Sequence, residues 1–338
     1  MKRAAGKVMQ WSQSPKAAPA EHQNLLLLNP RMWPGFGRPW QRQLNASLII
    51  KYLKPILAEL SEPAIAITTI PIVADIMSSL PVKSWHYYCV DDFSVWPGLD
   101  GVTLGTMEKQ MLPGTNGIIA ASEHLQNRLQ LLGYSSSLLT HGVDLPFWTN
   151  PTNIDGLELV KEIERPLIVF WGVIDKRMDI AFLPRLTADL KNGTVVLAGP
   201  QDEPHAELAT LPRTKLLGPL PLEQLPALAQ QADVLIMPYA DLPVTQAMQP
   251  LKLKEYLATG KPVVVRNLPA NRDWHDCLDL VNAPEEFSRR VMERLATGVP
   301  IDQANARQRL EHESWTQKAA LFSQLIKSPQ PLNPVSTR

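Results

Sequence analysis

Short apolar segments alternate with amphipathic segments along the second half of the chain, and this alternation restricts the possible folds. The pattern predicts strands at 167–171, 194–197, 214–217, 234–237, 262–265 and 278–281. It predicts helices at 180–190, 222–231, 250–259, 285–296 and 315–326. Apolar strands that alternate with helices form parallel sheets with helices on both faces. The second half is therefore expected to be an α/β domain of the Rossmann-like kind.

The first half shows the same alternation with less regularity. Strands are predicted at 25–28, 65–70, 85–90, 117–121 and 137–140, and helices at 44–60, 72–80, 103–112 and 122–132. A segment rich in Pro and Asn, residues 146–166, separates the two halves. Two such α/β units in series predict two Rossmann-like domains that face a cleft, with ligands bound outside the carboxyl ends of the strands.

The chain has 338 residues, a length that suits two domains of ordinary size. We expect an N-terminal Rossmann-like domain at 1–150, in which residues 1–23 are irregular, and an interdomain linker at 151–165. A second Rossmann-like domain is expected at 166–312, and a C-terminal helix and tail at 313–338.

Composition disfavours several classes of protein. The 33 basic and 33 acidic residues cancel, so no overall basic field favours nucleic acid. No apolar run approaches the roughly 20 residues of a membrane span. The two cysteines, Cys89 and Cys277, have apolar neighbours and no CxxC spacing, which fits reduced, buried thiols. We expect a cytoplasmic protein that can contact the inner membrane surface peripherally.

The segment around 250–260 contains the most informative chemistry. Pro250 opens a predicted helix that carries Lys252 and Glu255 and ends at Gly260. A free helix N-terminus with a lysine in its first turn suits a phosphate or diphosphate, because it offers unpaired N–H groups and positive charge. A carboxylate one turn later can accept hydrogen bonds from ribose hydroxyls. The pattern alone is equally compatible with a surface helix whose Lys and Glu are solvated.

The same segment, PLKLKEYLATGKPVV, resembles the donor-site helix of family 4 (group 1) glycosyltransferases, in particular the branch of teichuronic acid and exopolysaccharide enzymes. Other segments agree with this family in order and spacing: YYCVDDF at 87–93, AASEHL at 120–125, HGVD at 141–144, VFWGVID at 169–175, LAGP at 197–200 and LGPLPLEQLPALAQQADVLIMPY at 217–239. The resemblance covers about residues 25 to 326. It implies a two-domain GT-B enzyme that uses a nucleotide-sugar donor and a saccharide or lipid-linked acceptor.

The resemblance also implies roles for individual residues. Gly172 would begin the loop under the donor phosphates, Lys252 and the amides near Leu251 would hold the diphosphate, and Glu255 would hold the ribose. The base would lie near Leu217 and Gly218. On the acceptor side, the residues implied to line the cleft are Asp91, His141, Gly142 and Asp144, and Asp92 would support catalysis.

The chain departs from the family pattern at several positions. Ala247 replaces the first of two glutamates that many members carry with seven residues between them, and Glu255 is the second. Val173 and Met178 replace the basic residues of the phosphate loop, so Lys176 or Arg177 would have to substitute. The opening strand, glycine-rich loop and helix of the family are not found in residues 1–23, so the N-terminal domain is expected to lack its first β-α unit.

No metal or cofactor is expected, because the sequence has no Asp-x-Asp triplet and no HxxxH pair. The leaving diphosphate would then be stabilised by Lys252 and a nearby basic residue. The resemblance implies a metal-independent hexosyltransferase that retains anomeric configuration. Two alternatives remain open: a degenerate homologue that binds a nucleotide or a partner protein without turnover, and a nucleotide-sugar epimerase. The sequence does not identify the donor sugar, the base, the acceptor or the oligomeric state.

Overall fold

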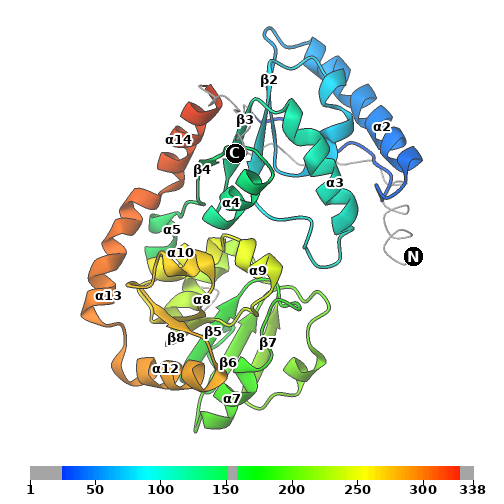
Figure 1. Ribbon diagram of the computed structural model, residues 1–338. Helices are drawn as coiled ribbons and strands as arrows, with labels where there is room; N and C mark the ends of the chain where they lie inside the picture. Colours follow the sequence, from blue (N-terminus) through cyan, green and yellow to red (C-terminus); the bar gives the residue numbers. More distant parts are fainter. Residues whose placement is uncertain (1–24, 151–157, 328–338) are drawn as a thin grey trace.

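Two parallel sheets, one in each half of the chain, form the framework of the molecule (Figure 1). The computed structural model describes residues 25–150 and 158–327. The expected irregular segment 1–23, residues 151–157 of the expected linker and residues 328–338 of the expected tail lie outside the described residues. None of the helices in the two described ranges is long and apolar enough to cross a bilayer.

The N-terminal sheet has the strand order β1-β2-β3-β4, with every neighbouring pair parallel. Its strands are β1 (Ile65–Thr68), β2 (Ser84–Cys89), β3 (Gly117–Ala120) and β4 (Ser137–Leu138). The helices of this half are α2 (Pro39–Ala58), α3 (Gly101–Met111), α4 (Glu123–Leu131) and α5 (Leu145–Thr149), together with three short 3₁₀ helices, η1 (Pro71–Asp75), η2 (Met77–Ser79) and η3 (Leu112–Gly114).

The C-terminal sheet has the strand order β10-β9-β8-β5-β6-β7, again all parallel. Its strands are β5 (Leu167–Trp171), β6 (Thr194–Ala198), β7 (Thr214–Gly218), β8 (Val234–Met237), β9 (Val263–Arg266) and β10 (Asp279–Val281). Read from β7, this is the doubly wound order 3-2-1-4-5-6. The order reverses between β5 and β8, so the crevice for a ligand is expected at their carboxyl ends.

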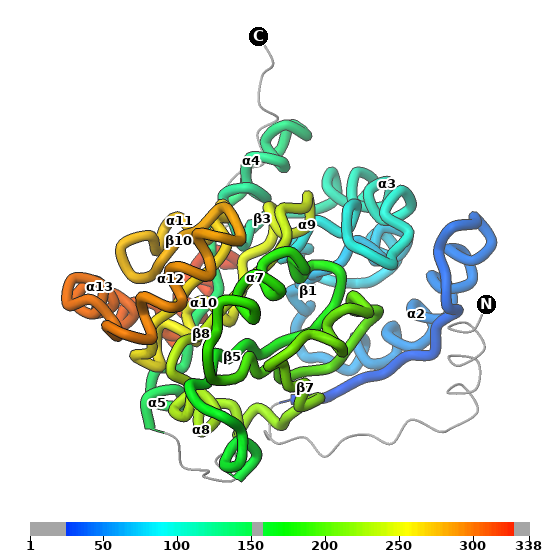
Figure 2. Tube along the Cα trace, turned by 90° about the horizontal axis from the view of Figure 1, so that it is seen from below, coloured from blue at the N-terminus to red at the C-terminus, as the bar shows by residue number. Residues whose placement is uncertain are grey.

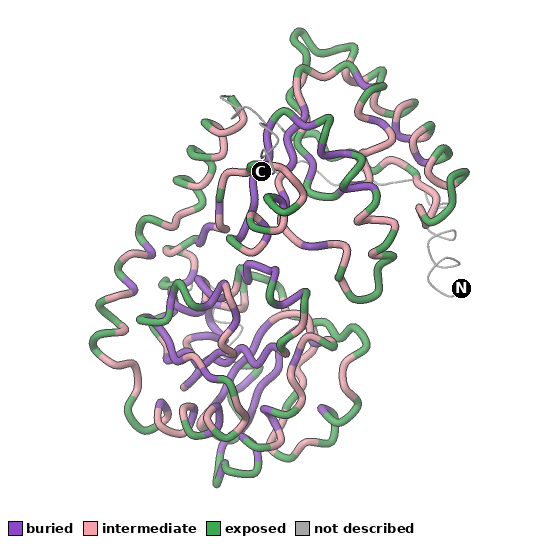
Figure 3. The backbone as a smooth tube through the Cα atoms, viewed as in Figure 1, coloured by how far each residue is buried: buried purple, intermediate pink, exposed green. Residues whose placement is uncertain are grey.

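Helices cover both faces of the C-terminal sheet and enclose the largest of the three hydrophobic clusters of the described residues (Figure 3). On one face α7 packs against α12, with the rings of Phe182 and Phe287 5.0 Å apart. On the other face lie α5, α8 and α10. The bounds in this half are α7 (Phe182–Asp189), α8 (Leu225–Gln231), α9 (Pro243–Ala247), α10 (Leu251–Ala258), α11 (Pro269–Arg272), α12 (Pro284–Thr297), η4 (Ala206–Ala209) and η5 (Leu222–Gln224).

The chain returns from the C-terminal half to the N-terminal half through α13 (Ile301–Ala306), η6 (Arg307–Glu313) and α14 (Trp315–Lys327) (Figure 1). The amide of Val143 donates to the carbonyl of Glu313 over 2.9 Å. The rings of Tyr88 and Phe322 lie 5.6 Å apart, so α14 packs on the N-terminal sheet. Figure 2, turned by 90°, shows α13 at the edge of the C-terminal half.

The structure confirms the predicted α/β class with two parallel sheets, but two local predictions are wrong. Residues 25–28 form no strand, and Leu26 is 69% exposed. An apolar run can be a strand only beside a neighbour that completes its backbone hydrogen bonds, and no described strand pairs with this one. The predicted helix 72–80 is instead the pair of 3₁₀ helices η1 and η2. Within residues 25–64, no strand precedes β1.

Candidate active site

The loop after β5 begins the candidate site at the point where the strand order reverses. Gly172 follows β5 directly and has φ +137°, a value that side chains disfavour. Its amide donates to the carbonyl of Ala198 over 2.9 Å. A Cβ on the neighbouring Gly199 would lie 1.9 Å from the carbonyl oxygen of Gly172. A glycine at position 199 is therefore required for these two backbones to approach each other.

Lys252 lies in the first turn of α10 and extends over this loop. Its Nζ atom donates to the hydroxyl of Tyr239 over 2.5 Å. It also lies 4.6 Å from the ring centroid of Phe170 and 5.0 Å from that of Tyr239. A Cβ on Gly172 would be 2.0 Å from this Nζ atom. The ammonium group and the glycine loop thus share one small volume at the carboxyl ends of β5 and β8.

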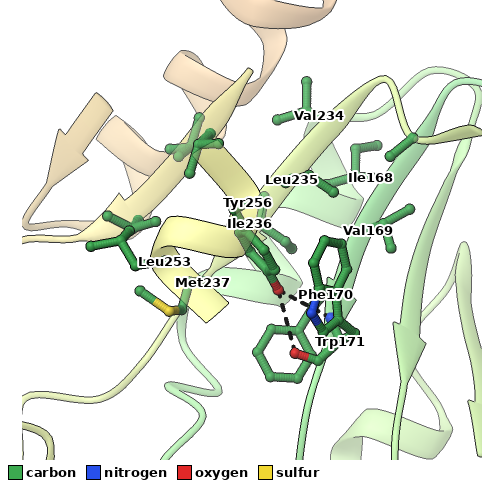
Figure 4. Packing of buried hydrophobic residues seen from close by; sticks show 14 of the residues in the cluster. Ile168, Val169, Phe170, Trp171, Val234, Leu235, Ile236, Met237, Leu253 and Tyr256 are labelled. Carbon is green, nitrogen blue, oxygen red and sulfur yellow. Dashed lines mark hydrogen bonds between the residues drawn. The ribbon is translucent and has the colours of Figure 1, made fainter. Parts of the chain in front are cut away.

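Tyr256 anchors α10 to the end of β5 from inside the core (Figure 4). Its hydroxyl accepts a hydrogen bond from the amide of Trp171 over 3.1 Å and lies 3.4 Å from the carbonyl oxygen of the same residue. The side chain is fully buried, and burial raises its pKa well above the ordinary value. Because Trp171 precedes Gly172, this contact sets the position of Lys252 relative to the loop.

Glu255 lies one turn after Lys252 on the same helix. The indole Nε1 of Trp171 donates to its carboxylate over 3.3 Å. Burial raises the pKa of this carboxyl, while Trp171 and Lys252 oppose the shift. Trp171 in turn stacks on Trp148 with ring centroids 5.2 Å apart and an interplanar angle of 8°. The carboxylate therefore lies near both the loop and the aromatic stack.

Arg177 lies on the loop after Gly172 and contacts both halves of the molecule. Its Nε and Nη2 atoms bond to the carboxylate of Asp175 at 2.9 and 2.7 Å. Its guanidinium carbon lies 5.1 Å from the ring of Trp96, which belongs to the N-terminal half. It also lies 5.9 Å from the ring of Tyr239. Arg177 and Lys252 therefore share Tyr239 as a neighbour.

The adjacent carboxylates Asp91 and Asp92 have different environments. Asp92 is 7% exposed, and its oxygens contact Arg128 Nε at 2.9 Å and Ser94 Oγ at 2.5 Å. Desolvation raises the pKa of Asp91 to about 6, against the opposing charge of Arg177. The charge of Arg177 therefore acts on Asp91, whereas Asp92 is bonded to Arg128 and Ser94. The catalytic role of Asp92 stays a prediction.

The residues predicted near the base lie close to the same glycine pair. Gly218, with φ +75°, accepts a hydrogen bond from the amide of Gly199 over 2.7 Å. Leu217 is half-buried beside it. Leu251, the first residue of α10, is 46% exposed. These positions are compatible with the predicted roles and do not test them.

The three cleft residues predicted from the HGVD segment lie where the two halves and the C-terminal segment meet. Burial, with the charges of Lys254 and Lys318, lowers the pKa of His141 to about 4. Gly142 is covered by Trp315, whose Cδ2 atom would be 2.8 Å from an added Cβ. Asp144 caps α5 by accepting from the amide of Phe147 over 3.2 Å. Their observed contacts are therefore structural.

Most of the second half of the chain matches a known protein family. Residues 165–297 match the model of the family described as glycosyl transferases group 1. Residues 165–297 are therefore similar to a group 1 glycosyltransferase domain. This domain contains the glycine loop, Lys252 and Glu255.

One relative is similar to part of the chain by sequence. Over 134 residues the chain is 31% identical to TuaH of Bacillus subtilis (strain 168), which carries the name of a teichuronic acid biosynthesis glycosyltransferase. The matched part is 38% of this chain and 34% of TuaH, so the match spans about one third of that relative.

Solved structures resemble both halves together. Sucrose-phosphate synthase from Thermosynechococcus elongatus matches with a TM-score of 0.68 at 16% identity, covering 89% of this chain and 82% of the other. HepE of Anabaena, solved in complex with UDP and glucose, matches with a TM-score of 0.68 at 14% identity, covering 87% and 84%. The two sheets on either side of the candidate site thus have the GT-B arrangement.

Within residues 25–150 and 158–327, no cluster of three or more His, Cys, Asp or Glu could hold a metal.

The sequence patterns did not predict several groups around the candidate site. Tyr239 and Tyr256 lie in the motifs at 217–239 and 250–264, but those motifs alone assign no function to either residue. The sequence does show one aromatic residue after a buried strand and another inside the donor helix, and these features could have indicated both residues. The contact of Trp96 with Arg177 and the burial of Lys254 had no signal in the sequence, because their partners are distant along the chain.

Proposed function

We propose that this chain is a glycosyltransferase that moves a hexosyl unit from a UDP-sugar to a saccharide or lipid-linked acceptor. The observation that carries the proposal is the position of the Lys252 ammonium over the Gly172 loop, at the switch point of a group 1 domain. An ammonium, a helix N-terminus and a glycine-lined backbone together suit a diphosphate. UDP is the proposed nucleotide because the structurally similar HepE binds it.

In this proposal each group around the loop contacts one part of the donor. Lys252 and the first amides of α10 hold the diphosphate, and Gly172 leaves room for it. Glu255 accepts from the ribose hydroxyls. The backbone at Leu217 and Gly218 contacts the base. Arg177 adds a second positive charge on the phosphate side, near the Tyr239 ring that it shares with Lys252.

The proposed reaction needs stabilisation of charge on the leaving group. The bond between the anomeric carbon and the β-phosphate oxygen breaks, and a bond from the acceptor hydroxyl to that carbon forms. The hydroxyl proton passes to the leaving diphosphate, so retention requires no separate protein base. The negative charge that develops is held by Lys252 and Arg177, whose cationic groups are fixed before the reaction. No metal or other cofactor is required in this scheme.

The acceptor is proposed to approach from the N-terminal half, where Trp96 contacts Arg177 and Asp91 interacts electrostatically with it. For a lipid-linked acceptor, we propose peripheral contact with the inner membrane surface from the cytoplasmic side. Exposed apolar side chains on the N-terminal half support this contact, among them Leu26 at 69% and Trp40 at 46% exposure. The buried free thiols of Cys89 and Cys277 fit a reducing compartment.

The test is a thermal-shift screen against UDP-, GDP- and dTDP-sugars, followed by titration calorimetry and an assay of UDP release with and without acceptor extract. We expect UDP-sugars to stabilise the chain and UDP to be released in the presence of EDTA. Loss of activity with EDTA that magnesium restores would contradict metal independence. Failure of every nucleotide to bind would contradict the donor site itself.

A second function follows from Ala247, which stands where many members have a glutamate. Its carbonyl accepts a hydrogen bond from Ser122 Oγ over 2.8 Å, so this position contacts the N-terminal half. A chain without that glutamate could bind a nucleotide or a partner without turnover. Tight UDP binding with no release of UDP from any UDP-sugar would favour this function over transfer.

A further inference from the structure

Lys254 belongs to the same helix as Lys252 but extends to the opposite side. Residues two apart on an α-helix point about 200° apart, whereas residues three apart share a face. Lys252 and Glu255 therefore lie toward the loop, and Lys254 extends away from it. Its side chain is only 3% exposed. A buried ammonium is costly unless it is paired and hydrogen-bonded, so its partners define its role.

The partners of Lys254 come from both halves of the molecule. Its Nζ atom donates to Thr140 Oγ1 over 3.2 Å and to the carbonyl of His141 over 2.5 Å, both after β4 of the N-terminal sheet. It also pairs with the carboxylate of Glu313, at the end of η6. Three segments that are far apart in the sequence thus meet at one ammonium group.

Lys318 completes the same cluster from α14. Its Nζ atom lies 2.7 Å from the Glu313 carboxylate and 3.1 Å from Thr140 Oγ1. The backbone of Glu313 also accepts from Val143, and Trp315 packs on Gly142. The C-terminal segment is therefore bound to the loop 140–144 through charges, backbone and an aromatic ring.

We propose that Lys254 is a positioning residue that fixes the donor helix α10 relative to the N-terminal half, and so sets the separation of donor and acceptor groups. The expected effect on turnover rests on the proposed function, whereas the contact between the two halves does not. Buried ion pairs contribute little net stability compared with apolar packing, but they impose a defined geometry. Because Lys254 and Lys252 share one helix, a shift at Lys254 moves Lys252 relative to Asp91 and Trp96.

The chain offers a matched control just beyond the C-terminal end of the same helix. Lys261 is half-buried, and its Nζ atom donates to the carbonyl of Gln230 over 2.7 Å. This contact lies wholly inside the C-terminal half. Lys254→Met and Lys261→Met remove the same charge and keep a similar unbranched stem, but only the first breaks a contact between the halves.

The experiment compares wild type, Lys254→Met and Lys261→Met in the full chain by amide hydrogen exchange, calorimetry with UDP, and steady-state transfer. We expect Lys254→Met to lose exchange protection in peptides covering 140–144 and 313–315. We expect kcat to fall about 10- to 100-fold, because small misplacement of reacting groups has effects of that size. The Kd for UDP should be unchanged, and Lys261→Met should match wild type in all three measurements.

Two results would overturn the proposal: wild-type protection and kcat in Lys254→Met, or a rise in the Kd for UDP that accounts for the loss of activity. If Lys254→Met does not fold, Thr140→Val removes one acceptor on the N-terminal side and should produce a smaller change of the same kind. Wild-type protection and kcat in Thr140→Val would then overturn it. If wild type transfers no sugar, the proposed function fails, and hydrogen exchange still decides whether Lys254 joins the halves.

Discussion

The Lys252 ammonium lies in the space that a side chain on Gly172 would need, 2.0 Å from the position of the missing Cβ. Lys252 belongs to the first turn of α10, and Gly172 to the loop after β5. Their contact brings a positive charge and an unobstructed backbone together at the point where the strand order reverses. The donor site that we propose depends on this pair.

Removal of the Lys252 charge should weaken the binding of UDP. Charge-assisted hydrogen bonds contribute about 1.5–3 kcal/mol, so Lys252→Ala should raise the Kd for UDP roughly 10- to 100-fold. Titration calorimetry measures this change directly. Lys191→Ala is the control, because exposed Lys191 precedes β6 at the opposite end of the sheet. Equal UDP affinity in the two variants would remove Lys252 from the donor site.

A methyl group at Gly172 should affect the site more than the fold. Gly172→Ala strains a backbone with φ +137° and displaces the Lys252 ammonium. Gly260→Ala also strains a backbone, at φ +74°, but an added Cβ there meets no atom within 4 Å. We expect both variants to lose about 1–3 kcal/mol of unfolding free energy. Only Gly172→Ala should lose affinity for UDP, as measured by calorimetry beside denaturant unfolding.

Asp91 should make stability depend on pH. Its pKa is raised to about 6 in the folded chain from an ordinary value near 4, so the folded state binds the proton more tightly. The free energy of unfolding should therefore fall as pH rises from about 4 through 6, by on the order of 2 kcal/mol from this group. Urea titrations of wild type and Asp91→Asn test this.

In Asp91→Asn this part of the pH dependence should vanish, and the variant should be more stable than wild type at pH 7. Asn has a similar shape and carries no charge to desolvate. A variant whose stability falls between pH 4 and 6 as steeply as that of wild type would show that Asp91 does not titrate in this range.

Arg128 should be essential for the stability of the N-terminal half. It lies between the buried carboxylates Asp92 and Glu108, bonding the first through Nε at 2.9 Å and the second through Nη1 at 3.1 Å. Arg128→Met leaves both charges without their cation, so we expect a loss of about 3–5 kcal/mol of unfolding free energy. Thermal and denaturant unfolding measure this loss.

The control for Arg128 is an exposed ion pair on α7. Arg185 is 47% exposed and lies 2.8 Å from Asp189 one turn later. Arg185→Met should leave the unfolding free energy nearly unchanged, because solvent screens an exposed ion pair. A loss below about 1 kcal/mol in Arg128→Met would mean that solvent reaches the buried carboxylates.

The α/β class and most strands of the C-terminal sheet could be predicted from the amino-acid pattern alone, because hydrophobic periodicity is a local property. The strand predicted at 234–237 has the observed bounds of β8, and the helix predicted at 250–259 is α10 at 251–258. Lys252 and Glu255 could be singled out because a proline before the helix and a lysine in its first turn are visible in one short segment. The prediction of a strand at 25–28 was wrong because a strand also needs a neighbouring strand that completes its backbone hydrogen bonds.

Which charged groups face the candidate site and which are structural became clear only from the folded arrangement. Asp91 and Asp92 are neighbours in sequence, yet Arg128 occupies the second and leaves the first near Arg177. Lys254 lies 113 residues from His141 and 59 from Glu313. Burial and electrostatic partners depend on such distant contacts, which a local pattern of residue types does not contain.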